Sequence, residues 1–185
     1  MISPFKGTFK VTSPRGYRIL GGKTECHAGL DLVALGEDKN VYAIADGKVD
    51  AVPYEQDGFG YYVRQLLNDG TRVYYGHMAK GSICVKAGQN IKVGDKLGVM
   101  GSTGASTGAH CHIEHRIKGT SKTSLDISAL TGIPNKKGTY EAVLTANECA
   151  NFIKAKCGFS DSTMEYLKKY KWADDLFKKL WDAMK

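Results

Sequence analysis

The glycines of this 185-residue chain are distributed very unevenly. All but two of the 22, Gly138 and Gly158, lie in residues 1–135. There they separate short segments in which Val, Ile and Tyr alternate with polar residues, and Asp-Gly pairs at 46–47 and 69–70 mark turns. Such spacing is typical of short strands joined by tight turns. We therefore predict a mainly β domain over 1–135, built as an antiparallel, sandwich-like sheet.

The pattern becomes helical after residue 135. The segment "TGIPNKKG", residues 131–138, is a linker candidate because Gly, Pro and Asn cluster there. Thr145–Glu148 has the form of a capping box, and Ser160 is a second candidate N-cap. Apolar residues over 164–184 recur at amphipathic helical spacing. We predict two or three short helices in an α-helical appendage over 136–185.

The role of this appendage is left open between wall binding, oligomerisation and packing on the β domain. Trp172 and Trp181 lie on its apolar stripe and offer a candidate wall-binding face. Aromatic residues at helical spacing belong more often to a core, and we favour that interpretation.

The charge balance favours an anionic partner. The net charge is +7 and the pI is about 9.1, which suits nucleic acid, a membrane surface or a bacterial wall. No block of Lys and Arg interleaved with aromatics is present, so nucleic acid is not favoured. No stretch approaches the ~20 apolar residues of a membrane span.

The cysteines and the amino-terminal residues indicate the cellular compartment in which the chain is made. The five cysteines are odd in number and contain no Cys-x-x-Cys pair, which argues for free, mostly buried thiols and against a cysteine-based zinc site. The first twenty residues lack the apolar core of a secretory signal. The expectation is a chain made in the cytoplasm, or a fragment whose signal has been removed.

Three of the five histidines lie within residues 110–115. If this segment is a strand, His110 and His112 project from one face, which suits a metal site. A hydrolytic zinc ion needs about three protein ligands and an open position. His27 and Asp31, in "HAGLD", could join one histidine of the strand as a His₂Asp set. The other strand histidine and His77 could then handle protons and charge.

Three blocks of this sequence resemble a known family. "HAGLD", "YGHM" and "GSTGASTGAHCHIE" are similar to the signature blocks of the lysostaphin-type zinc endopeptidases. The resemblance covers roughly residues 10–130, with the blocks in the family's order and spacing. It implies a mainly β enzyme with one zinc ion per chain that cuts peptide bonds in bacterial peptidoglycan.

The resemblance also assigns roles by position. It implies that His27, Asp31 and His112 bind zinc, and that His77 and His110 are the catalytic pair, with His110 the expected base. All five positions are filled, which disfavours an inactive scaffold.

Several neighbouring residues have a functional and a structural interpretation. Glu114 shares the histidine face, where it either orients a ligand or forms a plain salt bridge. His115 falls on the opposite face and is interpreted as packing or surface. Cys26 and Cys111 adjoin site residues, but we expect small buried side chains that turn away. Tyr17 is the nearest candidate for a tyrosine that assists catalysis in this family, although "ILGGKTEC" intervenes before the first block.

Two functions of different classes follow. The first is a peptidoglycan endopeptidase of phage type, either an endolysin that is made in the host cytoplasm and released to the wall or a lysin carried on the virion. Its basic surface would hold it to anionic wall polymers. The alternative is a non-catalytic wall-binding or assembly module that retains the family fold. A sugar-transport phosphocarrier domain is set aside because it has no use for the His-x-x-x-Asp block. The sequence does not indicate which peptide bond is cut.

Overall fold

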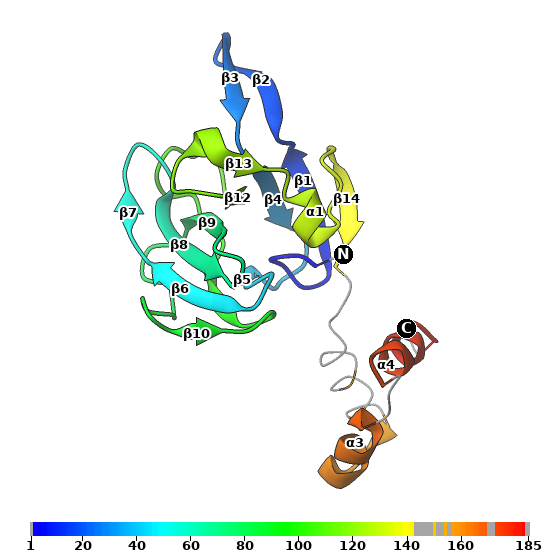
Figure 1. The fold of residues 1–185 in the computed structure, drawn as a ribbon. Helices are drawn as coiled ribbons and strands as arrows, with labels where there is room; N and C mark the ends of the chain where they lie inside the picture. Colours follow the sequence, from blue (N-terminus) through cyan, green and yellow to red (C-terminus); the bar gives the residue numbers. More distant parts are fainter. Residues whose placement is uncertain (1, 143–149, 151–153, 155–156, 170–172, 184–185) are drawn as a thin grey trace. The chain divides into compact units, whose positions relative to one another are not determined.

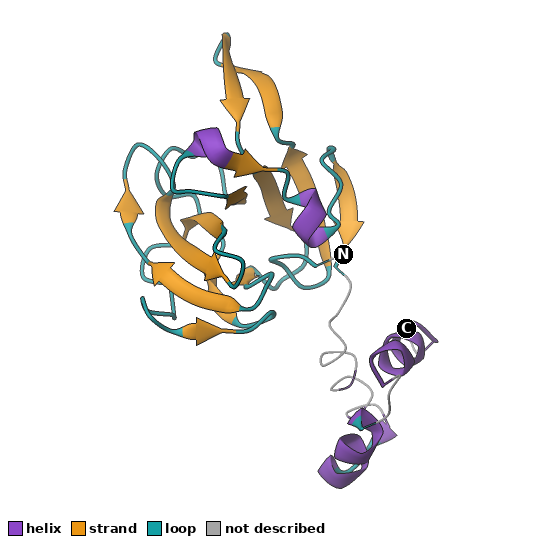
Figure 2. Cartoon of the chain, in the orientation of Figure 1, coloured by secondary structure: helices purple, strands orange, loops and turns teal. Residues whose placement is uncertain are grey.

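A computed structural model describes residues 2–142, 150, 154, 157–169 and 173–183. The chain divides into two compact units, Met1–Ala142 and Val143–Lys185. The first unit is mainly β and the second is helical, as Figure 2 shows by colour. The predicted fold class, a mainly antiparallel β domain followed by a small helical appendage, is confirmed.

One antiparallel sheet of ten strands organises the described part of the first unit. Eight strands follow one another across it in Figure 1: β10 (Asn90–Ile91), β6 (Gly47–Ala51), β8 (Gly60–Leu67), β9 (Arg72–Met78), β12 (Cys111–Arg116), β4 (Leu30–Ala34), β1 (Thr8–Ser13) and β14 (Gly138–Glu141). The short strands β7 (Tyr54–Glu55) and β13 (Ser124–Leu125) pair with β8 and β12. The strand predicted over the histidine-rich segment is therefore an interior strand, between β9 and β4.

Two small two-stranded sheets complete the first unit. One joins β5 (Asn40–Tyr42) to β11 (Lys96–Val99), and the other is the hairpin of β2 (Gly16–Leu20) and β3 (Lys23–His27). This hairpin stands out from the large sheet at the top of Figure 1. A 3₁₀ turn, η1 (Ser121–Thr123), and a single helical turn, α1 (Ser128–Thr131), follow β12.

Burial along the strands explains where polar residues gather. Strand β1, between β4 and β14, alternates, with Phe9 and Val11 buried and Lys10 exposed, as expected for a sheet with one face in contact with solvent. In β12 all six residues are buried. Two of them, Cys111 and Ile113, join the apolar core. His112 and Glu114 alternate with these residues and therefore bury polar groups on the opposite face, where such groups need partners.

The boundary between the units lies later in the chain than position 135. The predicted linker, residues 131–138, belongs to the β unit: Ile133 is fully buried in its core, and Gly138 begins β14. Strand β14 completes the sheet beside β1, with Gly138 opposite Val11. The Gly, Pro and Asn residues of this segment therefore form a turn into an edge strand, and the first unit ends at Ala142.

The second unit contains the described helices α3 (Asp161–Lys168) and α4 (Ala173–Ala183). Ser160 caps α3 as predicted, since its hydroxyl oxygen accepts a hydrogen bond from the Thr163 amide at 3.2 Å. A small apolar cluster, which includes Met164 and Phe177, joins the two helices. The predicted capping box at 145–148, Trp172 and the side chain of Trp181 lie outside the described residues. Neither described helix is long and apolar enough to span a bilayer.

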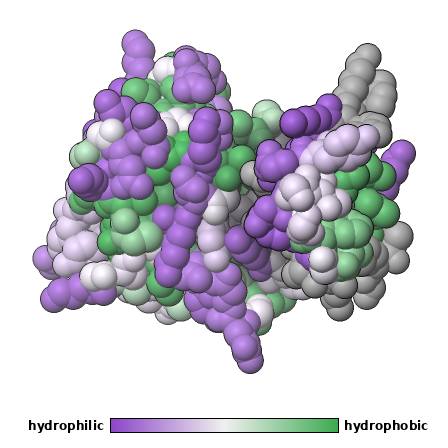
Figure 3. Space-filling view, turned by 90° about the horizontal axis from the view of Figure 1, so that it is seen from below, coloured by the Kyte–Doolittle hydropathy of each residue, from purple (hydrophilic) through white to green (hydrophobic). Residues whose placement is uncertain are grey.

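Hydrophilic side chains project at many points of the face drawn in Figure 3, with smaller hydrophobic areas between them. This mixture agrees with the basic, charged composition of the chain.

The loop before β12 supplies a test of the fold. Gly104 has φ +73°, and a Cβ there would lie 2.2 Å from the Gly60 amide nitrogen. Gly104→Ala should destabilise the protein by at least about 2 kcal/mol, because it adds backbone strain to a backbone clash. Gly108, in the same loop, has no atom within 4 Å of such a Cβ. Gly108→Ala is therefore the matched control, and thermal unfolding should separate the two. Equal melting temperatures would contradict this packing of the loop.

Candidate metal centre

Three strands bring together His27, Asp31 and His112. His27 is the last residue of β3, and Asp31 lies in β4. His112 lies in β12, directly opposite Asp31 in the antiparallel pair. Gly29, between β3 and β4, allows the close approach, because a Cβ there would lie 2.3 Å from the Ile113 carbonyl oxygen and 2.8 Å from His112 Nε2.

The donor atoms of these residues form a small triangle. His27 Nε2 lies 3.1 Å from Asp31 Oδ1 and 3.0 Å from His112 Nδ1, and His112 Nδ1 lies 2.9 Å from Asp31 Oδ1. All three side chains are buried. Zinc–nitrogen bonds of about 2.0–2.1 Å in a tetrahedron place ligand atoms roughly 3.3 Å apart. The triangle is therefore close to the size that a tetrahedral ion requires.

The second nitrogen of each imidazole sets the tautomer. His27 Nδ1 donates to the Pro14 carbonyl oxygen at 2.8 Å, so its neutral form carries no proton on Nε2. His112 Nε2 lies 3.4 Å from Glu114 Oε2 and donates to it, so Nδ1 presents its lone pair. Two lone pairs and a carboxylate oxygen thus converge. One proton cannot satisfy three acceptors, whereas a divalent cation can, and this donor set fits zinc.

The electrostatics also favour a cation. Burial alone would raise the pKa of Asp31, but the imidazoles of His112 and His27 bring it well below its usual range. Burial would lower the pKa of His112, but the carboxylates of Asp31 and Glu114 outweigh it and raise that pKa. Asp31 is therefore ionised at neutral pH and offers a negatively charged oxygen donor to a cation.

Two arginines hold the carboxylates in place. Arg116 donates to both oxygens of Glu114, at 2.7 and 2.9 Å, while Glu114 contacts His112. Glu114 therefore forms a salt bridge with Arg116 and also orients His112, so both roles considered for it from the sequence apply. Arg18 donates from Nη1 to Asp31 Oδ2 at 3.0 Å and from Nε to Glu25 at 2.5 Å. Sequence reasoning missed Arg18, whose only local signal is its position opposite Glu25 in the hairpin.

The two remaining predicted residues, His77 and His110, lie against this triangle. Their ring centroids are 4.5 Å apart, and His110 Nε2 is 3.5 Å from Asp31 Oδ1. Each ring donates from Nδ1 to a backbone carbonyl, His77 to Thr103 at 2.8 Å and His110 to Gly108 at 2.7 Å. Both Nε2 atoms are therefore unprotonated when the rings are neutral. The structure brings all five predicted site residues to one cavity of about 340 Å³.

His77 is held in a strained conformation. Its φ is +60°, the only positive value for a non-glycine residue in the described part of the chain. Its amide donates to the Phe59 carbonyl oxygen at 2.7 Å. Burial lowers the pKa of this imidazole to about 4, so the ring is neutral at pH 7. Strain of this kind persists where the surroundings enforce it, which is common at functional sites.

The cysteine prediction is partly wrong. Cys111 is buried in the core, but Cys26, Cys84 and Cys157 are exposed, and Cys149 lies outside the described residues. Cys26 lines the cavity without joining the donor triangle. Cys26 belongs to the β2–β3 hairpin, which stands out from the large sheet in Figure 1.

The other neighbours lie outside the donor triangle. His115 belongs to the opposite face of β12, as predicted, and its Nε2 lies 2.8 Å from the Thr71 hydroxyl. Tyr17 is 84% exposed on the hairpin and borders an adjoining cavity. The structure therefore gives neither residue a contact with the five site residues.

Comparison with known proteins identifies related sequences. The family model described as Peptidase family M23 matches residues 25–124. An uncharacterised metalloprotease of Haemophilus influenzae is 36% identical over 67% of this chain and 26% of its own length. The peptidoglycan DD-endopeptidase ShyC of Vibrio cholerae is 33% identical over 60% of this chain and 24% of its own. The chain thus spans about a quarter of the length of these curated relatives.

Solved structures agree with these matches. The catalytic domain of the antimicrobial peptidase lysostaphin from Staphylococcus simulans aligns with a TM-score of 0.56 at 28% identity, covering 65% of this chain and 89% of that one. The catalytic domain of EnpA, a prophage-encoded M23 protein of Enterococcus faecalis, aligns with a TM-score of 0.57 at 33% identity, covering 68% and 94%.

Metal binding is directly measurable. Metal-free protein should take up one zinc ion per chain, and a hundredfold excess over the dissociation constant should stabilise it by about 2.7 kcal/mol. Asp31→Ala should lose most of this uptake and stabilisation, because it removes one corner of the triangle. Cys26→Ser, the matched control at the same cavity, should bind zinc as the unaltered protein does. Elemental analysis and thermal unfolding give both readouts, and loss of zinc in Cys26→Ser would refute the assigned donor set.

Proposed function

Because the chain belongs to peptidase family M23, we propose that it is a zinc-dependent endopeptidase that hydrolyses peptide bonds in bacterial peptidoglycan. One observation carries the proposal. The lone pairs of His27 and His112 and an oxygen of Asp31 converge beside the His77–His110 pair, in a cavity open to solvent. A structural metal site would have neither the neighbouring bases nor the cavity.

The family is zinc-dependent, and the donor set fits that ion. His27 Nε2, Asp31 Oδ1 and His112 Nδ1 would hold it. When bound, zinc supplies Lewis acidity, which polarises a carbonyl and lowers the pKa of water toward about 7. Glu114 and Arg18 keep His112 and Asp31 oriented toward the ion.

His110 is the proposed general base. Its Nδ1 proton is committed to the Gly108 carbonyl oxygen, so Nε2 presents a lone pair toward Asp31 and the cavity. That atom can accept the proton of an attacking water and later deliver it to the leaving amine.

His77 is the proposed partner that steadies developing negative charge. Its Nδ1 proton is committed to Thr103, so Nε2 can donate only after it gains a second proton. Burial keeps the resting ring neutral, and the His110 ring lies 4.5 Å away between centroids, so a positive charge on one ring opposes a positive charge on the other. The pair is therefore suited to carrying a single proton during the reaction rather than two.

We propose a phage-type setting, with synthesis in a host cytoplasm and release to the wall, or carriage on the virion. The similarity to prophage-encoded EnpA supports this setting. The net charge of +7 is complementary to anionic wall polymers. A protein of this kind should lyse susceptible cells when it is added from outside.

The decisive experiment is a digest of purified peptidoglycans, both glycine-bridged and directly cross-linked, with mass spectrometry of the products. The zinc-loaded protein should create new amino termini. A chelator should abolish them, and His110→Ala should reduce the rate by about 100-fold or more, because a general base is lost. His115→Gln removes a histidine outside the cavity and should stay active. Folded, zinc-loaded protein that leaves every wall intact would refute the proposal.

Substitutions of His77 distinguish the effect of backbone strain on stability from the effect of losing the imidazole on activity. His77→Asn should stay within about 1 kcal/mol of the original stability, because Asn tolerates positive φ. It should nevertheless lose about 100-fold or more in peptidoglycan hydrolysis. His77→Val, which is β-branched, should be equally inactive and also less stable by about 2 kcal/mol. Denaturant unfolding and the digest measure both, and equal stability of the two variants would argue against the strained backbone.

A further inference from the structure

The cavity that holds the candidate metal centre continues into a second one. The second cavity, about 620 Å³, shares Arg18, Asp31, Thr107 and His110 with the first. The shared residues include the expected base and one metal ligand. A peptide bond positioned for attack would therefore have substrate extending into both cavities.

The two cavities differ in the charges that remain available. Arg15 and Lys137 border the second cavity, and Glu55 borders the first. Arg18 and Glu25 also lie here, but they pair with each other, and Arg18 pairs further with Asp31. Once those pairs are set aside, Arg15 and Lys137 are, in the part of the chain that the structure describes, the unpaired charged side chains on the second cavity, and Glu55 is the unpaired one on the first.

Arg15 has no carboxylate partner among the described residues. Its Nη2 donates only to Ser124, to the carbonyl oxygen at 3.1 Å and the hydroxyl at 3.2 Å. Its Nε is buried and has no hydrogen-bond partner in the described structure. Lys137 is exposed, and no ion pair involves it within the described ranges. Two cations on one cavity wall thus lack a counter-anion.

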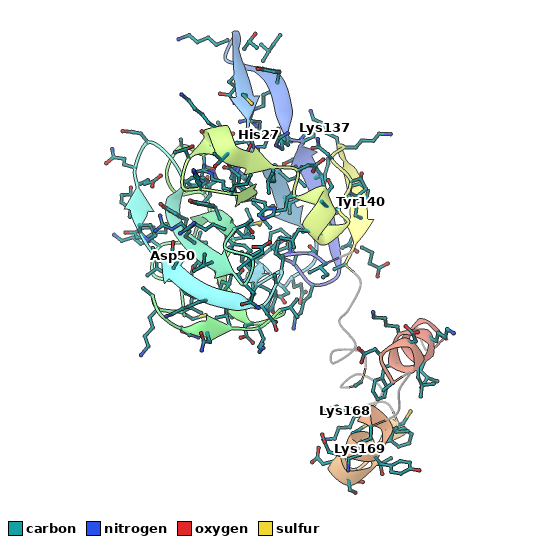
Figure 4. All side chains as sticks on the ribbon, in the orientation of Figure 1. His27, Asp50, Lys137, Tyr140, Lys168 and Lys169 are labelled. Atoms are coloured by element: carbon teal, nitrogen blue, oxygen red, sulfur yellow. The ribbon has the colours of Figure 1, made fainter. Side chains whose placement is uncertain are left out.

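The protein holds these two cations on adjoining segments. The Arg15 amide donates to Asn135 Oδ1 at 2.7 Å, and Asn135 Nδ2 donates back to the Arg15 carbonyl oxygen at 3.1 Å. Lys137 follows two residues later, immediately before Gly138 pairs with Val11. Arg15 and Lys137 both line the second cavity, and Figure 4 labels Lys137 near the base of the β2–β3 hairpin. Arg15 and the segment that carries Lys137 are therefore held together in the substrate-free protein.

We propose that Arg15 and Lys137 form a subsite for a carboxylate of the peptide substrate, close to the bond that is cut. This inference rests on the proposed endopeptidase function and narrows its substrate. Arginine and lysine donors suit a carboxylate, and a partly buried arginine binds one more strongly than a fully solvated lysine does. Both residues lie outside the region matched by the family model, so the subsite belongs to this chain rather than to the family pattern.

The anionic side sets the direction of binding. Glu55 accepts a hydrogen bond from the Tyr62 hydroxyl at 2.6 Å and has no cationic partner among the described residues. Glu55 disfavours a substrate carboxylate beside it, whereas Arg15 and Lys137 attract one, so the second cavity is the better place for that group. Stem peptides bear carboxylates near their cross-links, whereas the interior of a glycine bridge bears none. The subsite therefore selects stem-peptide bonds over glycine bridges.

The test uses two synthetic probes, acetyl-L-Lys-D-Ala-D-Ala as its free acid and as its carboxamide. Their binding to zinc-loaded His110→Ala protein is measured by calorimetry or NMR titration, and their hydrolysis by unaltered protein is followed separately. The acid should bind about tenfold more tightly than the amide at low salt, because two cations meet its charge. Raising the salt concentration should reduce this preference.

Variants of Lys137 and Lys136 show which residue is responsible for the preference for the acid probe. Lys137→Ala should weaken binding of the acid about threefold and leave binding of the amide unchanged. Lys137→Arg should retain the preference. Lys136→Ala, which removes the same charge from the neighbouring exposed residue outside the cavity, should change neither. An equal effect of Lys136→Ala and Lys137→Ala would mean that only the overall charge matters, and would overturn the subsite.

The two readouts separate this inference from the proposed function. A preference for the acid in binding, without hydrolysis of any probe or wall, would support the subsite and count against the endopeptidase. Hydrolysis of walls with equal binding of acid and amide would support the enzyme and refute the subsite. Absence of binding to both probes at millimolar concentration would also refute the subsite.

Discussion

The pairing of β4 with β12 is the constraint on which the site depends. In this register Asp31 faces His112 across two adjacent strands, and their donor atoms lie 2.9 Å apart. A shift by one residue would turn His112 into the apolar core and present Cys111 in its place. The neighbours of His112 prevent such a shift, because Cys111 and Ile113 are fully buried on the core face.

In this register the Glu114 carboxylate is buried, and neighbouring side chains offset the free-energy cost of its desolvation. Glu114 is 1% exposed and would be strongly disfavoured as an isolated buried carboxylate. Arg116 engages both of its oxygens, and Arg116 in turn lies over the Tyr74 ring at 4.3 Å. These contacts keep Glu114 ionised, which fixes the proton of His112 on Nε2 and leaves the Nδ1 lone pair facing Asp31 and His27.

Loops around the sheet complete the centre from the other side. The Gly104 turn packs on the backbone of Gly60, and it places the Thr103 carbonyl where His77 donates to it. The same loop ends at Gly108, whose carbonyl holds His110. The hydroxyls of Thr103 and Ser106 donate to the Met78 and Gly108 carbonyl oxygens, so threonine and serine help to build the turn that positions His77 and His110. The backbone carbonyls of this turn, rather than side chains, determine which histidine nitrogens are free.

Local sequence patterns were sufficient to predict the strand-rich and helical regions and to single out five candidate site residues, because period-2 alternation and the ordered His-x-x-x-Asp and His-x-His blocks are local signals. The folded structure was needed to show which nitrogens of His27, His77 and His110 are unprotonated, since the carbonyl oxygens of Pro14, Thr103 and Gly108, which accept from Nδ1 of these rings, leave no sequence pattern. It also decided that the first unit runs to Ala142 and that Arg15 adjoins Lys137. These features arise from contacts between residues more than one hundred positions apart or from backbone atoms, and neither is written in local spacing.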